Sequence, residues 1–219
     1  MGVEALNGLS QFLDDYPGMS TAPCSDACVC LRGKFRFKAN VSGSDEIEDS
    51  YKLEIIVPDK FPPALPKVKE TGGKIPRDGN FHVNPDGSLC LGSPLRLLKK
   101  VYSTPSVNGF ADKCLVPYLY AISYKLKNGG DFVFGELAHG DQGIVDDYSN
   151  ILGLKERSQI TQAIQLLGVK KRIANKKPCP CGCGKRLGAC SFHHKLNEFR
   201  KMAPVSWFKA HALNDWNRI

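Results

Sequence analysis

The chain has 219 residues, of which 42% are hydrophobic and 24% charged, so it can bury a core in one or two domains and is not a disordered tail. Its formal net charge of +8 is unevenly placed: residues 1–150 carry 16 basic and 19 acidic groups, whereas residues 151–219 carry 14 and 3. This split argues against polyanion binding along the whole chain and indicates a near-neutral domain followed by a basic module.

No export or membrane signal is evident in the sequence. Residues 1–6 lack the basic region and apolar run of a signal peptide, and Leu6 stands where a myristoylation signal needs Ser or Thr. No apolar stretch approaches the roughly 18 residues that cross a bilayer. Nine cysteines in such a chain favour metal ligation and free thiols over a disulfide framework. We therefore expect a cytoplasmic protein with no membrane partner.

The hydrophobic pattern predicts an α+β protein. In chain order we expect a helix at residues 4–15, three β-rich segments at 29–41, 51–57 and 66–70, and a long irregular loop at 71–94. Two further helices are expected at 110–127 and 155–171. Long irregular loops in compact domains tend to carry function. A basic hinge then leads into a cysteine cluster, and we expect domains at 1–153 and 178–219, joined by a helix and hinge at 154–177.

The irregular loop contains Cys90. A thiol that accepts an acyl group must be reachable, held on a rigid loop, and placed beside a donor for the tetrahedral oxyanion. Asn84, six residues earlier, could supply a side-chain amide, a contribution of about 3 kcal/mol in comparable sites. A lone cysteine between two leucines is ordinarily a buried, small hydrophobic residue. Cys90 by itself therefore does not decide between an acyl-accepting nucleophile and a residue of the core.

Residues 51–68 (YKLEIIVPDKFPPALPKV) and 81–91 (FHVNPDGSLCL) together resemble the ubiquitin-conjugating enzyme family. That family has a strand ending in Pro, an aromatic-Pro step, a further strand, a His-Pro-Asn loop and then its thioester cysteine. The resemblance covers about residues 4–127 and implies a ubiquitin-conjugating-enzyme-like fold, an antiparallel meander sheet with flanking helices. It also implies Cys90 as nucleophile, Asn84 as oxyanion stabiliser and His82 as a structural residue that braces the loop.

Several departures from this family bear on the reaction. The spacing from Asn84 to Cys90 is two residues shorter than in the eukaryotic pattern, and Gly92 stands where an acidic residue orients an incoming lysine. Lysine transfer would need a substitute from elsewhere in the chain. The candidates are Asp112, Asp131, Glu136 and His139.

These departures are similar to bacterial relatives encoded in CBASS antiphage systems beside a cGAS-like nucleotidyltransferase. The likeness implies cysteine-dependent acyl transfer, with a thioester between Cys90 and the C-terminus of a protein modifier or of the nucleotidyltransferase. An activating enzyme is then a further expected partner.

Residues 179–194 (CPCGCGKRLGACSFHH) resemble the SEC-C zinc-binding motif, Cys-Pro-Cys-Gly-Ser-Gly-Lys with a third Cys after eight residues. Ser191, a poor ligand, holds the motif's fourth ligand position. Three thiolates and one more ligand can surround a tetrahedral structural Zn²⁺, which a segment with few apolar residues needs to stay folded. The expected ligands are Cys179, Cys181, Cys190 and His193, with His194 or Cys183 as alternatives.

Aromatic and basic residues are mixed beyond this motif, in residues 195–218. They could bind nucleic acid through phosphate contacts and stacking, although packed aromatics and solvated cations explain the pattern as well. Two functions therefore follow from the sequence. One is acyl transfer with the zinc module as a partner adaptor; the other is an inactive conjugating-enzyme-like module that binds protein or nucleic acid through its basic tail.

Overall fold

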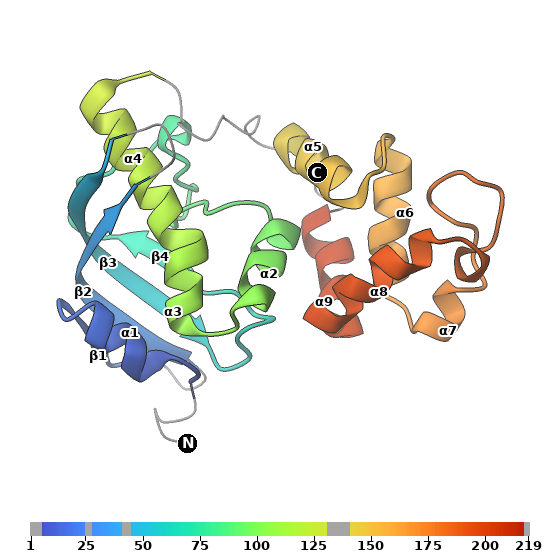
Figure 1. Ribbon diagram of the computed structural model, residues 1–219, viewed down its shortest axis with the longest axis horizontal. Helices are drawn as coiled ribbons and strands as arrows, with labels where there is room; N and C mark the ends of the chain where they lie inside the picture. Colours follow the sequence, from blue (N-terminus) through green and yellow to red (C-terminus); the bar gives the residue numbers. More distant parts are fainter. Residues whose placement is uncertain (1–5, 25–27, 41–44, 131–140, 217–219) are drawn as a thin grey trace. The chain divides into compact units, whose positions relative to one another are not determined.

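The structure is a computed structural model that describes residues 6–24, 28–40, 45–130 and 141–216 (Figure 1). The chain divides into two compact units, residues 1–136 and 137–219. None of the helices in the described ranges is both long enough and apolar enough to cross a membrane.

The first unit is built on a four-stranded antiparallel sheet in the order β1-β2-β3-β4. Its strands are Met19–Ala22 (β1), Cys28–Ala39 (β2), Ile47–Pro58 (β3) and Lys67–Glu70 (β4). The two long strands pair over their whole length, from Cys28 opposite Pro58 to Ala39 opposite Ile47. The predicted meander sheet is confirmed. Strand β1 was not predicted, because four residues with a single buried side chain are too short for an alternating pattern.

Helices cover one face of this sheet (Figure 1). Phe12 of α1 (Leu9–Asp15) is fully buried, and its ring stacks on that of Phe35 in β2 with centroids 6.2 Å apart. The predicted helix at 110–127 corresponds to α3 (Val107–Phe110), a π-helical turn at Ala111–Leu115, and α4 (Val116–Asn128). The flanking helices of the expected α+β fold are therefore present.

Helix α2 (Pro94–Ser103) was not predicted, although the sequence carries its start signal. The Ser93 hydroxyl accepts from the backbone N–H of Arg96 at 3.4 Å, and Pro94 occupies the first helical position. This start places the helix a few residues after Cys90, so the thiol lies between the irregular loop and a regular element.

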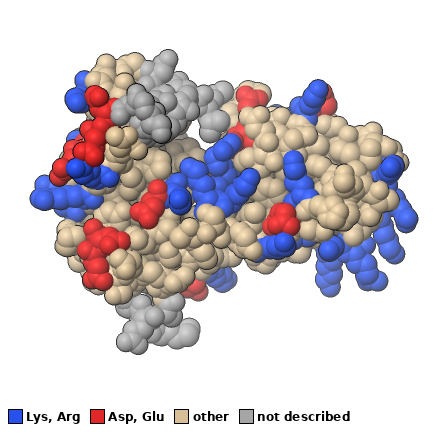
Figure 2. All heavy atoms as spheres, in the orientation of Figure 1, with Lys and Arg blue, Asp and Glu red and all other residues tan. Residues whose placement is uncertain are grey.

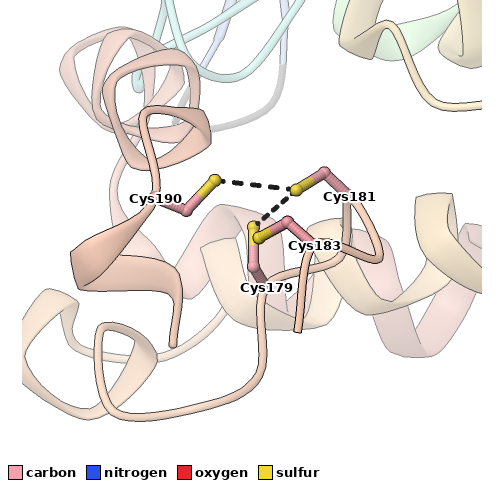
Figure 3. Close-up of side chains that lie close together, drawn as sticks. All are labelled: Cys179, Cys181, Cys183 and Cys190. Carbon is pink, nitrogen blue, oxygen red and sulfur yellow. Dashed lines mark hydrogen bonds between the residues drawn. The ribbon is translucent and has the colours of Figure 1, made fainter. Parts of the chain in front are cut away.

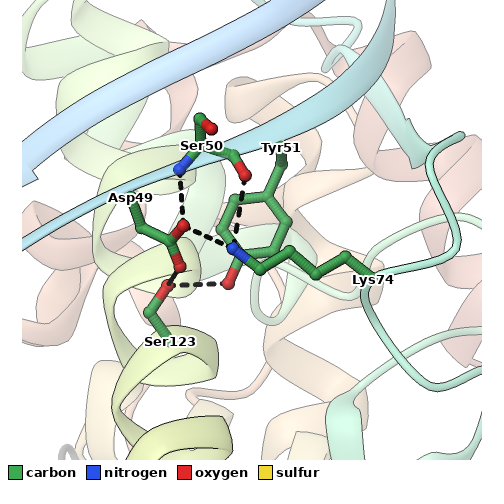
Figure 4. A network of polar contacts seen from close by, with 5 residues as sticks. All are labelled: Asp49, Ser50, Tyr51, Lys74 and Ser123. Atoms are coloured by element: carbon green, nitrogen blue, oxygen red, sulfur yellow. Dashed lines mark hydrogen bonds and ion pairs between the residues drawn. The ribbon is translucent and has the colours of Figure 1, made fainter.

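A polar network joins β3, α4 and the segment after β4 (Figure 4). The Asp49 carboxylate accepts from the Ser123 hydroxyl and from the Ser50 backbone N–H, each at 2.7 Å, and pairs with the Lys74 ammonium. The Tyr51 hydroxyl lies 2.6 Å from Ser123 Oγ. Burial alone raises the pKa of Asp49, but the hydrogen bonds it accepts, from Lys74 first, outweigh burial and hold the pKa below its ordinary value.

This network predicts an acid-dependent loss of stability. The pKa of Asp49 is lower in the folded protein than in the unfolded chain. Its contribution to the free energy of unfolding is therefore present above about pH 4 and is lost as the pH falls through the folded pKa. Asp49→Asn should therefore flatten the acid limb of the free energy of unfolding, measured by urea denaturation at a series of pH values. Asp59→Asn, at an exposed carboxylate, should keep the wild-type limb. An unchanged limb in Asp49→Asn would refute this prediction.

The second unit is helical in the part that the structure describes. Its helices are α5 (Asp141–Leu152), α6 (Arg157–Leu167), α7 (Lys171–Ala174), α8 (Phe192–Met202) and α9 (Val205–Ala210). The helix predicted at 155–171 corresponds to α6, and the short α7 begins within its last residues.

The core of the second unit includes α5. The Tyr148 ring stacks on that of Trp216 with centroids 5.3 Å apart, and its hydroxyl lies 2.9 Å from His211 Nε2. Trp216 Nε1 in turn donates to the Thr161 hydroxyl of α6 at 2.8 Å. These contacts join α5, α6 and the chain's last described residues, so the unit starts earlier than the expected domain limit at residue 153.

Candidate functional site

The nine cysteines separate into distinct groups. Cys24 and Cys28 form a disulfide between β1 and β2. In the first unit, Cys30 and Cys114 are free and buried, whereas Cys90 is free and half-buried. The remaining free cysteines lie in the second unit at positions 179, 181, 183 and 190. Two places therefore combine accessible sulfur with a defined setting, the Cys90 loop and this four-cysteine group.

Cys90 lies at the end of a small hairpin formed by residues 82–90. Its backbone N–H donates to the His82 carbonyl at 2.8 Å, and the N–H of Leu89 donates to the Val68 carbonyl of β4, also at 2.8 Å. One bond ties the thiol residue to the opposite arm of the hairpin, and the other ties the residue before it to the sheet. The loop that the sequence shows as irregular is therefore anchored where it carries the cysteine.

Helix α4 holds the other side of this loop. The Tyr118 hydroxyl donates to the Phe81 carbonyl at 2.8 Å. The following residue, His82, has a φ of 51°, a left-handed conformation that is uncommon outside glycine, and turns the chain into the hairpin. Burial raises the pKa of Tyr118 above its ordinary range, and the charge of a Cys90 thiolate is the next largest cause in the same direction. At neutral pH the Tyr118 hydroxyl thus keeps its proton, which it donates to the Phe81 carbonyl of the loop.

The environment of Cys90 favours the neutral thiol. Burial raises its pKa, and a hydrogen bond from the backbone N–H of Gly92 only partly offsets this effect. The thiol is therefore not activated by a neighbouring base or cation in the described chain. Its accessible sulfur can take part in thiol chemistry once a partner removes the proton.

Asn84 lies at the tip of the hairpin. Its side chain is exposed, and its amide Nδ2 donates to Ser88 Oγ at 3.0 Å; the Ser88 hydroxyl in turn donates to Asp86 Oδ1 at 2.5 Å. Gly87, with a φ of 78°, closes the turn by donating its N–H to the Asn84 carbonyl at 2.8 Å. The short spacing between Asn84 and Cys90 thus produces a tight turn, in which the Asn84 side-chain amide is bonded to Ser88. No hydrogen bond in the described ranges joins Asn84 to Cys90.

Of the four candidate substitutes for the missing acidic residue, Asp112 lies in the described part of the chain, and its hydrogen bond with Tyr16 does not involve the thiol. The Asp112 carboxylate accepts from the Tyr16 hydroxyl at 3.2 Å, beside α1. Asp131, Glu136 and His139 lie outside the described residues.

Four cysteines of the second unit gather in one place (Figure 3). The sulfur atoms of Cys179, Cys181, Cys183 and Cys190 all lie within 4.8 Å of one another. Cys181 Sγ is 3.2 Å from Cys179 Sγ and 3.6 Å from Cys190 Sγ. Tetrahedral zinc with bonds of about 2.3 Å places its sulfur ligands about 3.8 Å apart, so shifts of about 1 Å or less would fit the group to a metal ion. The cluster could therefore hold a metal ion.

A glycine-rich turn produces this arrangement. Gly182 and Gly184 have φ values of 76° and 72°, which only glycine adopts readily. The turn is closed where the N–H of Cys179 donates to the Lys185 carbonyl at 2.9 Å. The two left-handed glycines reverse the chain on either side of Cys183 and bring its sulfur back to the others. The flanking glycines are the signal that favours Cys183 as the fourth member.

The two histidines are not in the group, although His193 was the expected fourth ligand. His193 Nδ1 lies 2.6 Å from the Cys190 carbonyl oxygen, and the His193 and His194 rings contact each other with centroids 3.9 Å apart. A hydrogen bond of 3.5 Å from the Phe192 backbone N–H to Cys190 Sγ lowers the pKa of that thiol to about 7. The structure thus assembles four sulfurs, with Cys183, the expected alternative, in place of a histidine.

Comparison of the chain with protein-family models, with curated proteins and with solved structures finds no match. The geometry alone therefore defines the class of protein. It is a two-unit α+β protein with a half-buried loop thiol in one unit and a four-cysteine group that could hold a metal ion in the other.

Proposed function

We propose that Cys90 carries an acyl group as a thioester and transfers it, as in ubiquitin-conjugating enzymes. The observation that supports this function most is the position of the thiol: Cys90 is half-buried, between an anchored hairpin and α2, whereas the other free thiols of this unit are buried. The order of motifs around it and the meander sheet with flanking helices support the same function.

The proposed step is a thioester exchange. The Cys90 sulfur attacks the carbonyl carbon of an incoming thioester, its proton passes to the departing thiolate, and the acyl group moves from one sulfur to the other. A later nucleophile, an amine or a thiol, takes the acyl group and returns the Cys90 thiol. Burial raises the pKa of Cys90, which makes it a poorer leaving group and the thioester longer-lived. These properties favour an acyl carrier that discharges when a partner assists.

The partners follow from the resemblance. The acyl group would be the C-terminus of a protein modifier or of a cGAS-like nucleotidyltransferase in bacterial antiphage defence, loaded by an activating enzyme. We further propose that the metal is Zn²⁺ in a structural role, because four thiolates complete a tetrahedral site and leave no open position for catalysis. The second unit would then serve as an adaptor for a partner.

Intact mass measurement without reductant, on the full chain isolated from its native cells, tests the thioester. We expect an added mass on the wild type that hydroxylamine or dithiothreitol removes, because thioesters react with both reagents. Cys90→Ala should lack this mass completely, and Cys114→Ala, which alters a buried free thiol of the same unit, should keep it. An adduct that persists in Cys90→Ala, or no adduct on the wild type, would contradict the proposal.

A further inference from the structure

The second unit carries a group of exposed cations around α7 and the glycine-rich turn. No acidic residue occurs between Glu156 and Glu198, so apart from the four cysteines the charged side chains of these 41 consecutive residues are cationic. Figure 2 shows Lys and Arg side chains gathered at the end of this unit that carries α7. The basic surface consists of seven exposed side chains: Lys170, Lys171, Arg172, Lys176, Lys177, Lys185 and Arg186.

Backbone hydrogen bonds hold the two chain segments of the basic surface together. The N–H of Leu187 donates to the Lys177 carbonyl at 2.8 Å, and the N–H of Gly188 donates to the Asn175 carbonyl at 3.0 Å. The residues just before and just after the glycine-rich turn are therefore paired side by side. Although the cations come from two stretches of sequence, they share one rigid surface.

The chain just before α7, at the end of α6, is also fixed by an arginine of α8. The Arg200 guanidinium donates to the Leu166 carbonyl at 2.6 Å and to the Val169 carbonyl at 2.9 Å, at the end of α6. This half-buried side chain caps the helix from which the basic surface continues. The backbone that presents the cations is thereby held at both ends.

None of the seven cations forms an ion pair within the described residues. Some exposed cations in the first unit do: Arg32 pairs with Glu54, and Lys38 pairs with Glu46 at 2.9 Å. Seven like charges on one surface repel one another, and a zinc group with four thiolates, of net charge −2, would still leave an excess of positive charge. A polyanion that replaces the small counterions would relieve the repulsion.

We propose that the basic surface binds the phosphate backbone of a double-stranded nucleic acid without reading its sequence. Evenly spaced phosphates match a surface of positive charge, and contacts from Lys and Arg to phosphate carry no sequence information. Three of the aromatic side chains that could stack on unpaired bases, Phe199, Phe208 and Trp216, are buried in the core, and Phe192 and Trp207 are half-buried. This binding goes beyond the proposed function, because Cys90 takes no part in it.

Fluorescence anisotropy with a labelled 20-base-pair duplex of arbitrary sequence, over a range of salt concentrations, tests the proposal on the full chain. The logarithm of the affinity should fall with the logarithm of salt by about 0.9 per phosphate contacted. Lys176→Ala/Lys177→Ala should reduce this slope by up to about 2 and weaken binding about 10- to 100-fold at 0.1 M salt. Two duplexes of unrelated sequence should bind equally.

Matched variants separate the basic surface from net charge and from the thiol. Lys34→Ala/Lys52→Ala removes the same charge from the exposed face of the first unit's sheet and should leave the affinity and the slope unchanged. Cys90→Ala should also bind like the wild type, so a failed thioester test and a failed duplex test remain distinct. Equal losses in the two lysine pairs, no duplex binding at low salt, or polyglutamate that competes as well as duplex at equal charge would each overturn the proposal.

Discussion

Removing the metal that we propose for the four-cysteine group is expected to raise the amide hydrogen-exchange rates of residues 177–188 by at least about 100-fold. These amides include those of Cys179 and Leu187, which close the turn. Few apolar side chains support this segment, so thiolate–metal bonds, worth about 10 to 16 kcal/mol in zinc-finger peptides, would supply most of its stability. Exchange measured by mass spectrometry, with and without a chelator, reports the effect for each peptide.

The loss of protection should stay local. The core around Tyr148 and Trp216 does not include the cysteines, so peptides of α5 and α9 should keep most of their protection. Cys181→Ala should reproduce the effect of the chelator, and Cys114→Ala should show none. Equal protection of residues 177–188 with and without chelator would show that no metal holds the turn.

The second large effect is expected from Tyr148. Tyr148→Ala should lower the free energy of unfolding of the second unit by about 3 to 5 kcal/mol, because it removes a fully buried ring that stacks on Trp216. Tyr148→Phe keeps the ring and loses the hydroxyl contact with His211, so its cost should be nearer 1 kcal/mol.

Hydrogen exchange distinguishes the unit that is destabilised. In Tyr148→Ala, peptides of α6 and α9 should exchange faster, whereas peptides of β2 and β3 should exchange as in the wild type. If the β-strand peptides lost protection instead, α5 would belong energetically to the first unit, as the domain limit at residue 153 assumed.

The strands and longer helices could be predicted because their side chains repeat. Phe35 and Phe37 alternate with Lys and Arg in β2, and one face of that strand is buried. Helix α5 was missed because its run of polar residues, Asp146 and Asp147 before Tyr148, hides the apolar face. Its partner Trp216 lies 68 residues further along the chain, and no local pattern reveals such a contact.

The candidate sites were predictable to different extents for a physical reason. Cys179, Cys181 and Cys190 lie close in sequence, so their spacing predicts a shared site. The choice between Cys183 and His193 depends on the left-handed backbone at the neighbouring glycines, which composition suggests but does not fix. The tight turn around Asn84 directs its side-chain amide to the Ser88 hydroxyl. The spacing of residues in the sequence does not show which way that amide points.

The central claim is that the free thiols divide into a reactive loop thiol, a metal-bound group and buried core thiols. Rates of iodoacetamide labelling at each cysteine of the folded, zinc-loaded chain, read by peptide mass spectrometry, test this claim most directly. Cys90 should be labelled, while Cys30, Cys114 and the four cysteines of the second unit stay protected, and a chelator should expose those four alone. Labelling of Cys181 or Cys183 as fast as Cys90 before chelation, or a Cys90 as unreactive as Cys114, would contradict the account.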